Sequence, residues 1–72
     1  MKPMPTKDLR KLFKAMGCEK GDAKGSHEKW TAPGGHSTTL KAGDKEQASG
    51  TLRSIQAALA PEFGDRWLED NR

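Results

Sequence analysis

The sequence predicts an α+β domain in which two helices cover one face of a three-stranded antiparallel sheet and leave the other face open. Three observations lead to this prediction. Apolar residues recur with helical spacing over residues 9–16, and a second such stretch covers residues 52–59. Between them, strand-like segments flank the turn cluster Pro33-Gly34-Gly35. The resulting order is helix, strand, strand, strand, helix.

Length and composition limit the size of the core. The chain has 72 residues, of which 32% are apolar and 32% are charged, so residues 1–72 form one small domain and a second domain is excluded. A core of this size gives about 3–5 kcal/mol of stability, so we expect a marginally stable protein. The residues expected in the core are Leu9, Leu12, Phe13, Met16, Trp30, Leu40, Leu52, Ile55 and Leu59.

The first helix is predicted to begin after a loose lead-in, residues 1–5. Thr6 is the expected N-cap and Asp8 lies in the first turn, where the helix dipole favours an anion. Gly17 supplies the left-handed residue that ends the helix. Four basic residues are expected on its outer side, where they either solvate the helix or attract RNA: Lys7, Arg10, Lys11 and Lys14.

Three strands are predicted between the helices. The best of them covers residues 26–32, and another covers about residues 36–40, which contain two threonines and a leucine. The Pro-Gly-Gly turn joins these two as antiparallel neighbours. Residues 18–24 are interrupted by Gly21 and Asp22, so they predict only a short, poorly specified strand or a loop.

The candidate functional residues lie together in one heptapeptide, Lys24-Gly25-Ser26-His27-Glu28-Lys29-Trp30. Because side chains alternate along a strand, His27 and Lys29 are expected on one face, while Glu28 and Trp30 are expected on the other. Trp30 then anchors the strand in the core, and His27 and Lys29 stay open to a ligand.

Two small residues precede the histidine. Gly25 allows a tight turn or a close approach of the backbone to a phosphate, and Ser26 offers a hydroxyl to the same anion. Lys24 adds a second ammonium group beside them. This combination predicts an RNA-cutting site, and solvated surface charge is the alternative interpretation of Lys24 and Lys29.

Residues 41–50 are polar and without periodicity, so they predict a surface loop. Ser49 is expected to cap the second helix, and Pro61 is expected to end it. Beyond it, Phe63, Trp67 and Leu68 suggest one or two further helical turns. This apolar ridge either packs on the core or binds a partner.

Charge and cysteine content indicate the kind of partner and compartment. Residues 1–41 hold nine Lys/Arg against four Asp/Glu, net +5, whereas residues 42–72 hold four against six, net −2. The basic half is suited to a polyanion. The single cysteine, Cys18, forms no internal disulfide and fits a reducing cytoplasm as a small buried residue. The sequence lacks a signal peptide and any apolar run of the roughly 18–20 residues that cross a bilayer, so we expect no membrane contact.

At two blocks the sequence resembles the HicA (YcfA-like) toxins of bacterial toxin-antitoxin pairs. The first block is Gly25-Ser26-His27 with an aromatic residue three positions later and then a Pro-Gly turn. The second opens the last helix, Gly50-Thr51-Leu52-Arg53-Ser54-Ile55. The resemblance covers about residues 6–60 and leaves residues 61–72 as a C-terminal extension.

The resemblance implies a fold like the double-stranded-RNA-binding domain and a metal-independent endoribonuclease that cleaves mRNA without a cofactor. His27 matches the family's catalytic histidine, and Gly25 and Ser26 match the residues before it. The implied partner is a HicB-like antitoxin. The chain departs from the family after the third strand, because residues 40–46 contain neither the usual proline nor a histidine.

Cleavage of RNA without a metal uses the substrate's 2′-hydroxyl as nucleophile, so the site needs a base near neutral pH and a positive field. A histidine suits the first requirement, and Lys24 and Lys29 suit the second. The rival interpretations are a non-catalytic RNA-binding module of the same fold and an interaction protein that docks through Phe63 and Trp67. His36 is interpreted as a turn residue beside two glycines. Base stacking is the minor alternative for Trp30.

Overall fold

Helix α1 (Thr6–Ala15) buries the apolar stripe that its sequence predicts. The computed structural model describes the backbone of residues 1–72 and every side chain except those of Ala23 and Lys24. Leu9 and Phe13 are fully buried, while Leu12 and Met16 pack partly buried against the core. Gly17, with φ of 84°, ends the helix as predicted. The N–H of Cys18 bonds back to the Phe13 carbonyl at 2.9 Å and so satisfies a carbonyl at the helix end.

Thr6 is not the N-cap that the sequence predicts. Pro5 occupies that position and Thr6 is the first helical residue. The Thr6 hydroxyl donates to the carbonyl oxygen of Asp44 at 2.6 Å and accepts from the side-chain amide of Gln47 at 2.8 Å. The prediction was wrong because the hydroxyl has partners far along the chain, which a local capping pattern does not reveal.

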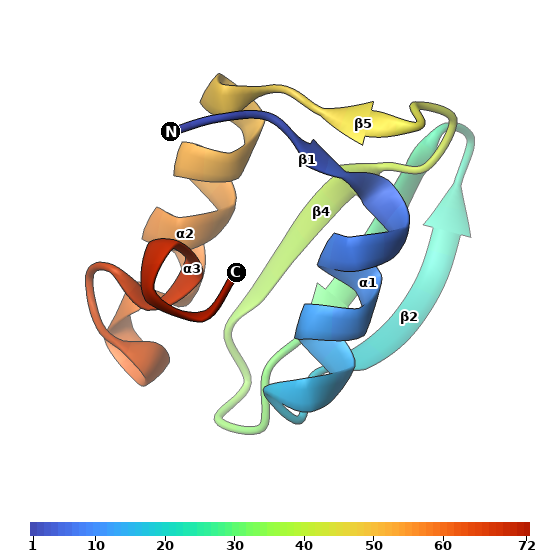
Figure 1. Ribbon diagram of the computed structural model, residues 1–72. Coiled ribbons are helices and arrows are strands. Elements are labelled where there is room, and N and C mark those ends of the chain that lie inside the picture. The colour runs from blue at the N-terminus through green and yellow to red at the C-terminus, as the bar shows by residue number, and fades with distance from the viewer.

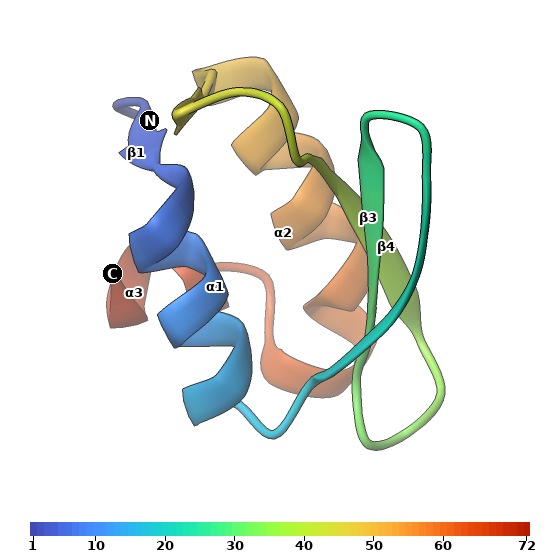
Figure 2. The ribbon, with the colours of Figure 1, turned by 90° about the vertical axis from the view of Figure 1, so that its right-hand side faces the viewer.

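The three strands β2 (Glu19–Lys24), β3 (His27–Thr31) and β4 (Ser37–Lys41) form an antiparallel sheet in the order β2-β3-β4. Helices α1 and α2 (Ser49–Phe63) lie on one face of it, and none of the described helices lies on the other (Figure 2). This is the predicted α+β architecture, similar to the double-stranded-RNA-binding domain. All but the first residue of the weakly predicted segment 18–24 form strand β2, and β4 begins and ends one residue later than predicted.

Glycines make both turns of this sheet possible. Gly25 and Ser26 form a two-residue loop between β2 and β3, in which Gly25 has φ of 60°. Residues 32–36 connect β3 to β4, with the turn at residues 33–35, and Gly35 there has φ of 100°. Short hairpin loops need residues with positive φ at such positions, and glycine adopts them without steric cost.

The lead-in and the polar loop pair with each other, contrary to prediction. Met4–Pro5 forms β1 and Glu46–Gln47 forms β5, and the two short strands are antiparallel (Figure 1). Met4 and Gln47 are 5% and 1% exposed. Residues 1–5 are therefore not a loose lead-in, and residues 41–50 are not wholly a surface loop. Strands of two residues are too short to show an alternating pattern, and the two segments lie far apart in the sequence, so the sequence analysis could not predict their pairing.

Helix α2 differs from prediction at both ends. Ala48 is its N-cap, and Ser49 is its first residue, with no capping bond from a side chain at the N-cap. Pro61 lies inside the helix, which continues to Phe63. Proline removes one backbone hydrogen bond, to the carbonyl of Ala57, but both residues are exposed and water can satisfy that carbonyl. None of the described helices is long and apolar enough to cross a membrane.

The C-terminal residues complete the core. Helix α3 (Trp67–Asn71) buries Trp67 and Leu68, which are 2% and 0% exposed. The rings of Phe13 and Trp67 lie 6.4 Å apart, and those of Phe13 and Trp30 lie 5.0 Å apart. The indole N–H of Trp67 donates to the carbonyl of Gln56 at 3.0 Å. The apolar ridge therefore packs on the core, and a partner is not needed to cover Trp67.

Candidate functional site

Strand β3 separates the candidate functional residues from the core as predicted. His27 and Lys29 are exposed, whereas Glu28 and Trp30 are 3% and 1% exposed. One face of the strand is thus exposed to solvent on the open side of the sheet, and the other packs against the helices. Burial of Trp30 confirms the core interpretation and removes its ring from any base-stacking role.

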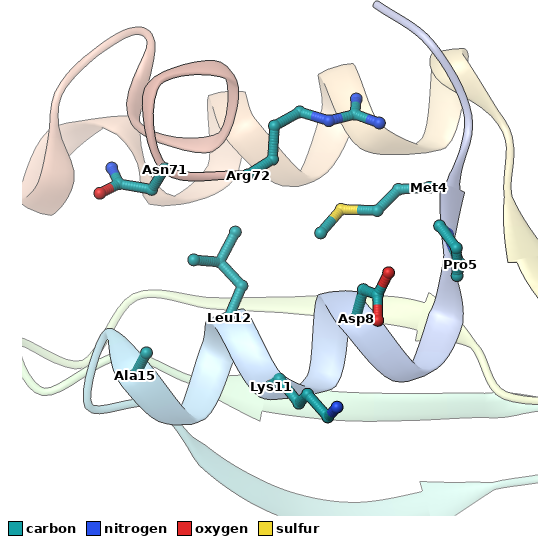
Figure 3. A pocket seen from close by; sticks show the side chains of 8 residues that line it. All are labelled: Met4, Pro5, Asp8, Lys11, Leu12, Ala15, Asn71 and Arg72. Atoms are coloured by element: carbon teal, nitrogen blue, oxygen red, sulfur yellow. The ribbon is translucent and has the colours of Figure 1, made fainter.

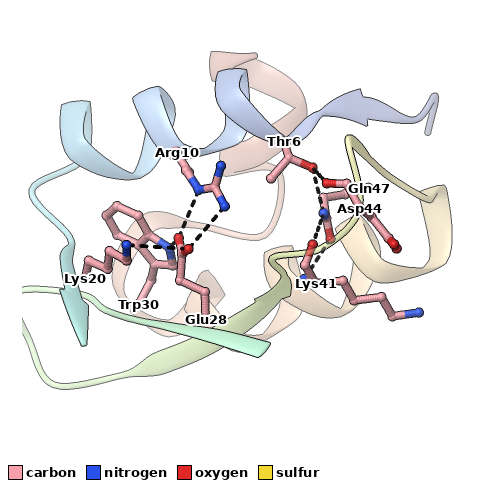
Figure 4. Close-up of polar contacts among 8 residues, drawn as sticks. All are labelled: Thr6, Arg10, Lys20, Glu28, Trp30, Lys41, Asp44 and Gln47. Carbon is pink, nitrogen blue, oxygen red and sulfur yellow. Dashed lines mark hydrogen bonds and ion pairs between the residues drawn. The ribbon is translucent and has the colours of Figure 1, made fainter. Parts of the chain in front are cut away.

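Glu28 holds the buried side of this strand in place (Figure 4). Its carboxylate accepts hydrogen bonds from Arg10 at 3.1 and 3.2 Å and from the Trp30 indole at 2.7 Å. The Lys20 ammonium lies 3.7 Å away. Burial on its own raises the pKa of Glu28, but these hydrogen bonds and positive charges outweigh it, and the pKa lies below its ordinary value.

Arg10 corrects one prediction about the first helix. It was expected on the outer side with Lys7, Lys11 and Lys14, which are indeed exposed. Instead the Arg10 side chain is only 35% exposed and binds the 4% exposed side chain of Glu28. A long side chain can reach past the edge of its helix, and a buried carboxylate gives it a partner there.

The register of the sheet places Lys24 and Lys41 in the same row as His27. His27 pairs with Lys24 of β2 on one side and with Lys41 of β4 on the other. The pairing fixes the position of the Lys24 backbone beside His27. The Lys24 side chain lies outside the described part of the chain, so its predicted contact with phosphate stays a prediction. The His27 row therefore crosses all three strands at one end of the sheet.

His27 and Lys41 form the closer of the two kinds of antiparallel pair. Ala42 N–H donates to the Ser26 carbonyl at 2.6 Å, and Ala32 N–H donates to the His36 carbonyl at 2.7 Å. Hydrogen-bonded pairs alternate with non-hydrogen-bonded pairs, so even-numbered residues of β3 belong to the first kind and His27 to the second. Side chains in such pairs approach closely, with Cα atoms about 4.5 Å apart.

An open hollow of about 530 Å³ lies on this face of the sheet beside His27. A register shift between Lys20 and Ala23 of β2 accompanies it, and the two intervening residues contribute to its wall. The residues that line it are Gly21, Asp22, His27, Lys29, Thr31 and Thr39. The hollow is thus a mixed surface of one imidazole, one ammonium, one carboxylate and two hydroxyls.

Gly25 and Ser26 lie beside this hollow, in the loop that leads into His27. Both residues are exposed, and the Ser26 carbonyl is occupied by the Ala42 N–H. In the part of the chain that the structure describes, no atom outside the adjacent residues would lie within 4 Å of a Cβ at Gly25, so its positive φ rather than crowding explains glycine there. The predicted contact between this loop and a phosphate stays a prediction.

Three residues near His27 were missed by the sequence analysis: Asp22 and Thr39, which line the hollow, and Lys41, which pairs with His27 across the sheet. A signal for two of them was present. Once residues 33–35 are taken as a three-residue turn, counting outward along both strands puts Thr39 opposite Lys29 and Lys41 opposite His27. Asp22 had no such signal, because the register shift that brings it to the hollow depends on the pairing of β2.

His36 and Cys18 lie away from the hollow. The Nδ1 atom of His36 is 3.1 Å from Oε1 of Glu62, at the turn end of the β3-β4 hairpin. Cys18 is 6% exposed, and burial together with the nearby negative charge of Glu62 raises the pKa of its thiol. A turn residue and an inert buried thiol are therefore the correct interpretations.

A second hollow, of about 540 Å³, lies between α1 and the C-terminal segment. Figure 3 shows Leu12 and Met4 directed into it, with Arg72 above them. The Arg72 guanidinium donates to the carbonyls of Lys2 and Pro3 at 2.7 and 3.0 Å, so it ties the two ends of the chain together. None of the residues that line this second hollow also lines the hollow beside His27.

One protein family matches this chain. Its model, described as the HicA toxin of bacterial toxin-antitoxin systems, matches residues 6–60. The chain belongs to the HicA toxin family. The match confirms the resemblance over the span that the sequence analysis gave, and it makes this protein a toxin. No curated protein and no solved structure matches the chain.

The HicA match ends inside helix α2, which continues to Phe63. The matched residues 6–60 hold α1, most of α2, the three-stranded sheet and the hollow beside His27. Trp67 and Leu68 lie outside the match, yet they are among the most buried residues. The C-terminal extension of this HicA toxin is therefore part of its core.

Proposed function

We propose that this HicA toxin is an endoribonuclease that cleaves mRNA, with His27 as its general base. The observation that carries the proposal is the position of His27, exposed on the open face of the sheet, opposite Lys41 and beside Lys29. An imidazole is the side chain whose charge changes near neutral pH, and cations beside it attract the phosphate of RNA.

The reaction follows from the chemistry of RNA itself. His27 removes the proton of a 2′-hydroxyl, and that oxygen attacks the adjacent phosphorus. The bond from phosphorus to the 5′-oxygen breaks, and the leaving oxygen takes a proton from solvent. The products are a 2′,3′-cyclic phosphate and a 5′-hydroxyl. These steps involve only the substrate hydroxyl, a base and positive charge, so the proposed mechanism is metal-independent.

Four residues are proposed to bind the RNA: Lys24, Gly25, Ser26 and Lys29. Lys29 lines the hollow beside His27, and Gly25 and Ser26 form the exposed loop that joins Lys24 to His27. Backbone N–H groups, a hydroxyl and ammonium groups are the donors that proteins use toward phosphate. A HicB-like antitoxin is the proposed partner, and covering the open face would block access to His27.

The test is growth arrest after induced expression of wild type, His27→Ala and His36→Ala. We expect His27→Ala to abolish growth arrest and His36→Ala to retain it, because only His27 lies on the proposed site. Both substitutions remove one exposed imidazole from the same hairpin. His36→Ala also removes the contact between Nδ1 of His36 and Glu62, so it is the more demanding control for folding. Circular dichroism of the purified variants checks that each is folded. Growth arrest by a folded His27→Ala toxin would contradict the catalytic assignment and leave RNA binding as the function.

A further inference from the structure

We propose that Lys41 is a further residue of the RNA-cleaving site, contacting the scissile phosphate opposite His27, and that Gln47 is its positioning residue. This inference rests on the proposed function. It starts from the register of β3 and β4, in which Lys41 is the residue that directly faces His27. Because the pair is of the non-hydrogen-bonded kind, the two side chains emerge close together on one face of the sheet.

The Lys41 ammonium is available to a ligand. Lys41 is exposed, and no ion pair joins it to any of the side chains that the structure describes. Figure 4 shows its side chain extending away from the amide of Gln47 and from α1. An exposed lysine usually samples many conformations, so the position of its backbone decides what it can reach.

Gln47 fixes that backbone from the other side. Strand β4 is at the edge of the sheet, where the N–H and C=O of Lys41 point away from β3. The Gln47 side chain accepts from that N–H at 3.0 Å and donates to that C=O at 2.9 Å. It also donates to the Thr6 hydroxyl at 2.8 Å and is itself 1% exposed. A buried amide with all these partners holds Lys41 in register with His27.

The position of Lys41 gives it a different task from Lys29. Charge develops on the phosphate that is being cleaved, next to the histidine that takes the proton, so a cation directly opposite His27 meets the charge that grows. Lys29 lies two residues farther along β3, about 7 Å from His27 by the rise of a strand. It is placed to hold a neighbouring phosphate, whose charge does not change.

The experiment compares Lys41→Gln with Lys45→Gln. Lys45 is an exposed lysine in the loop after β4 and lines a different hollow, so its loss removes the same charge from outside the site. Two quantities are measured for each variant: the single-turnover cleavage rate at saturating RNA, and the affinity for an uncleavable RNA that carries 2′-deoxyribose. We expect Lys41→Gln to lower the rate about 100-fold with a much smaller loss of affinity, and Lys45→Gln to leave the rate unchanged.

The role of Gln47 is tested by a double-mutant cycle. Gln47→Leu should lower the cleavage rate in the wild-type background, because Lys41 is then free to move. In the Lys41→Gln background the same substitution should have no further effect. An equal loss in both backgrounds, measured at a temperature where all four proteins are folded, would make Gln47 merely structural and overturn its positioning role.

The outcomes separate this inference from the proposed function. If His27→Ala stops cleavage and Lys41→Gln cleaves at the rate of Lys45→Gln, only the assignment of Lys41 is overturned. If the wild-type toxin cleaves no RNA, or His27→Ala cleaves as fast as wild type, the proposed function is overturned and the assignment of Lys41 falls with it.

Discussion

Arg10 of α1 binds Glu28 of β3 through two hydrogen bonds, of 3.1 and 3.2 Å, and so fastens the helix to the inner side of the strand whose outer side carries His27. Glu28 and His27 are adjacent in the chain and point to opposite faces. The ion pair therefore holds the strand that carries the proposed catalytic histidine. It lies on the core side of that strand, opposite the face proposed to bind RNA.

The first prediction concerns acid. The pKa of Glu28 is lower in the folded protein than its ordinary value of 4.5, so the unfolded chain binds this proton more readily. The contribution of Glu28 to stability is therefore complete above about pH 5 and is lost as the pH falls through the folded pKa. Urea unfolding from pH 7 to pH 3 should show this loss for wild type and a smaller loss for Glu28→Gln.

At pH 7 the same substitution should lower the free energy of unfolding by about 1.5–3 kcal/mol, because the hydrogen bonds to Arg10 lose their ionic character. An equal dependence on pH in wild type and Glu28→Gln would show that other carboxylates govern the acid response. Asp65→Asn is the matched control, since Asp65 is exposed and should leave the pH dependence unchanged.

The second prediction concerns the extension beyond the family match. Trp67→Ala should lower the free energy of unfolding by about 3–5 kcal/mol, because it empties a buried site against Phe13 and leaves the Gln56 carbonyl without its indole donor. A domain of this size has about that much stability in total, so the variant should be largely unfolded. Thermal unfolding followed by circular dichroism measures this.

Trp67→Phe is the control for the ring. It keeps one aromatic ring in the site but loses the indole hydrogen bond and part of the buried ring volume, so it should cost less than Trp67→Ala, about 1–3 kcal/mol. A melting temperature of Trp67→Ala within a few degrees of wild type would contradict this prediction and show that burial of Trp67 contributes little to stability.

The third prediction uses charges of both signs in one hollow. Lys29→Gln should weaken binding of uncleavable RNA and flatten the dependence of log affinity on log salt by about 0.7, the value for one phosphate contact with a single strand. Asp22→Asn, on the wall of the same hollow, should strengthen binding because it removes repulsion of phosphate. Affinity is measured at several salt concentrations for each variant.

Lys14→Gln is the matched control for Lys29→Gln, since Lys14 is an exposed lysine on α1. It should change affinity little. If Lys14→Gln has as large an effect on the salt dependence as Lys29→Gln, the attraction of RNA is diffuse and the hollow is not its binding site.

The fourth prediction concerns the products. Cleavage should proceed in excess chelator and leave 2′,3′-cyclic phosphate ends, because the proposed nucleophile is the 2′-hydroxyl of the substrate. Mass spectrometry of the fragments identifies the ends. Activity that disappears in chelator and returns with a divalent ion would contradict the proposed mechanism.

Local patterns in the sequence were enough for the main elements. The stripe from Leu9 to Met16, the alternation from His27 to Trp30 and the stripe from Leu52 to Leu59 each contain their own period, so both helices and the central strand followed from them. The same alternation assigned His27 and Lys29 to the open face. The blocks around His27 and Gly50 were also enough to identify the HicA family, which the match to residues 6–60 confirms.

Only the tertiary structure decided what depends on contacts between distant segments. The β1-β5 pairing, the hydrogen bonds that Thr6 makes with Asp44 and Gln47, and the burial of Trp67 bring together residues that lie far apart in the sequence. Arg10 illustrates the reason. Its position on the helix predicts exposure, but a buried carboxylate on another element offers two hydrogen bonds, and that interaction outweighs the local tendency.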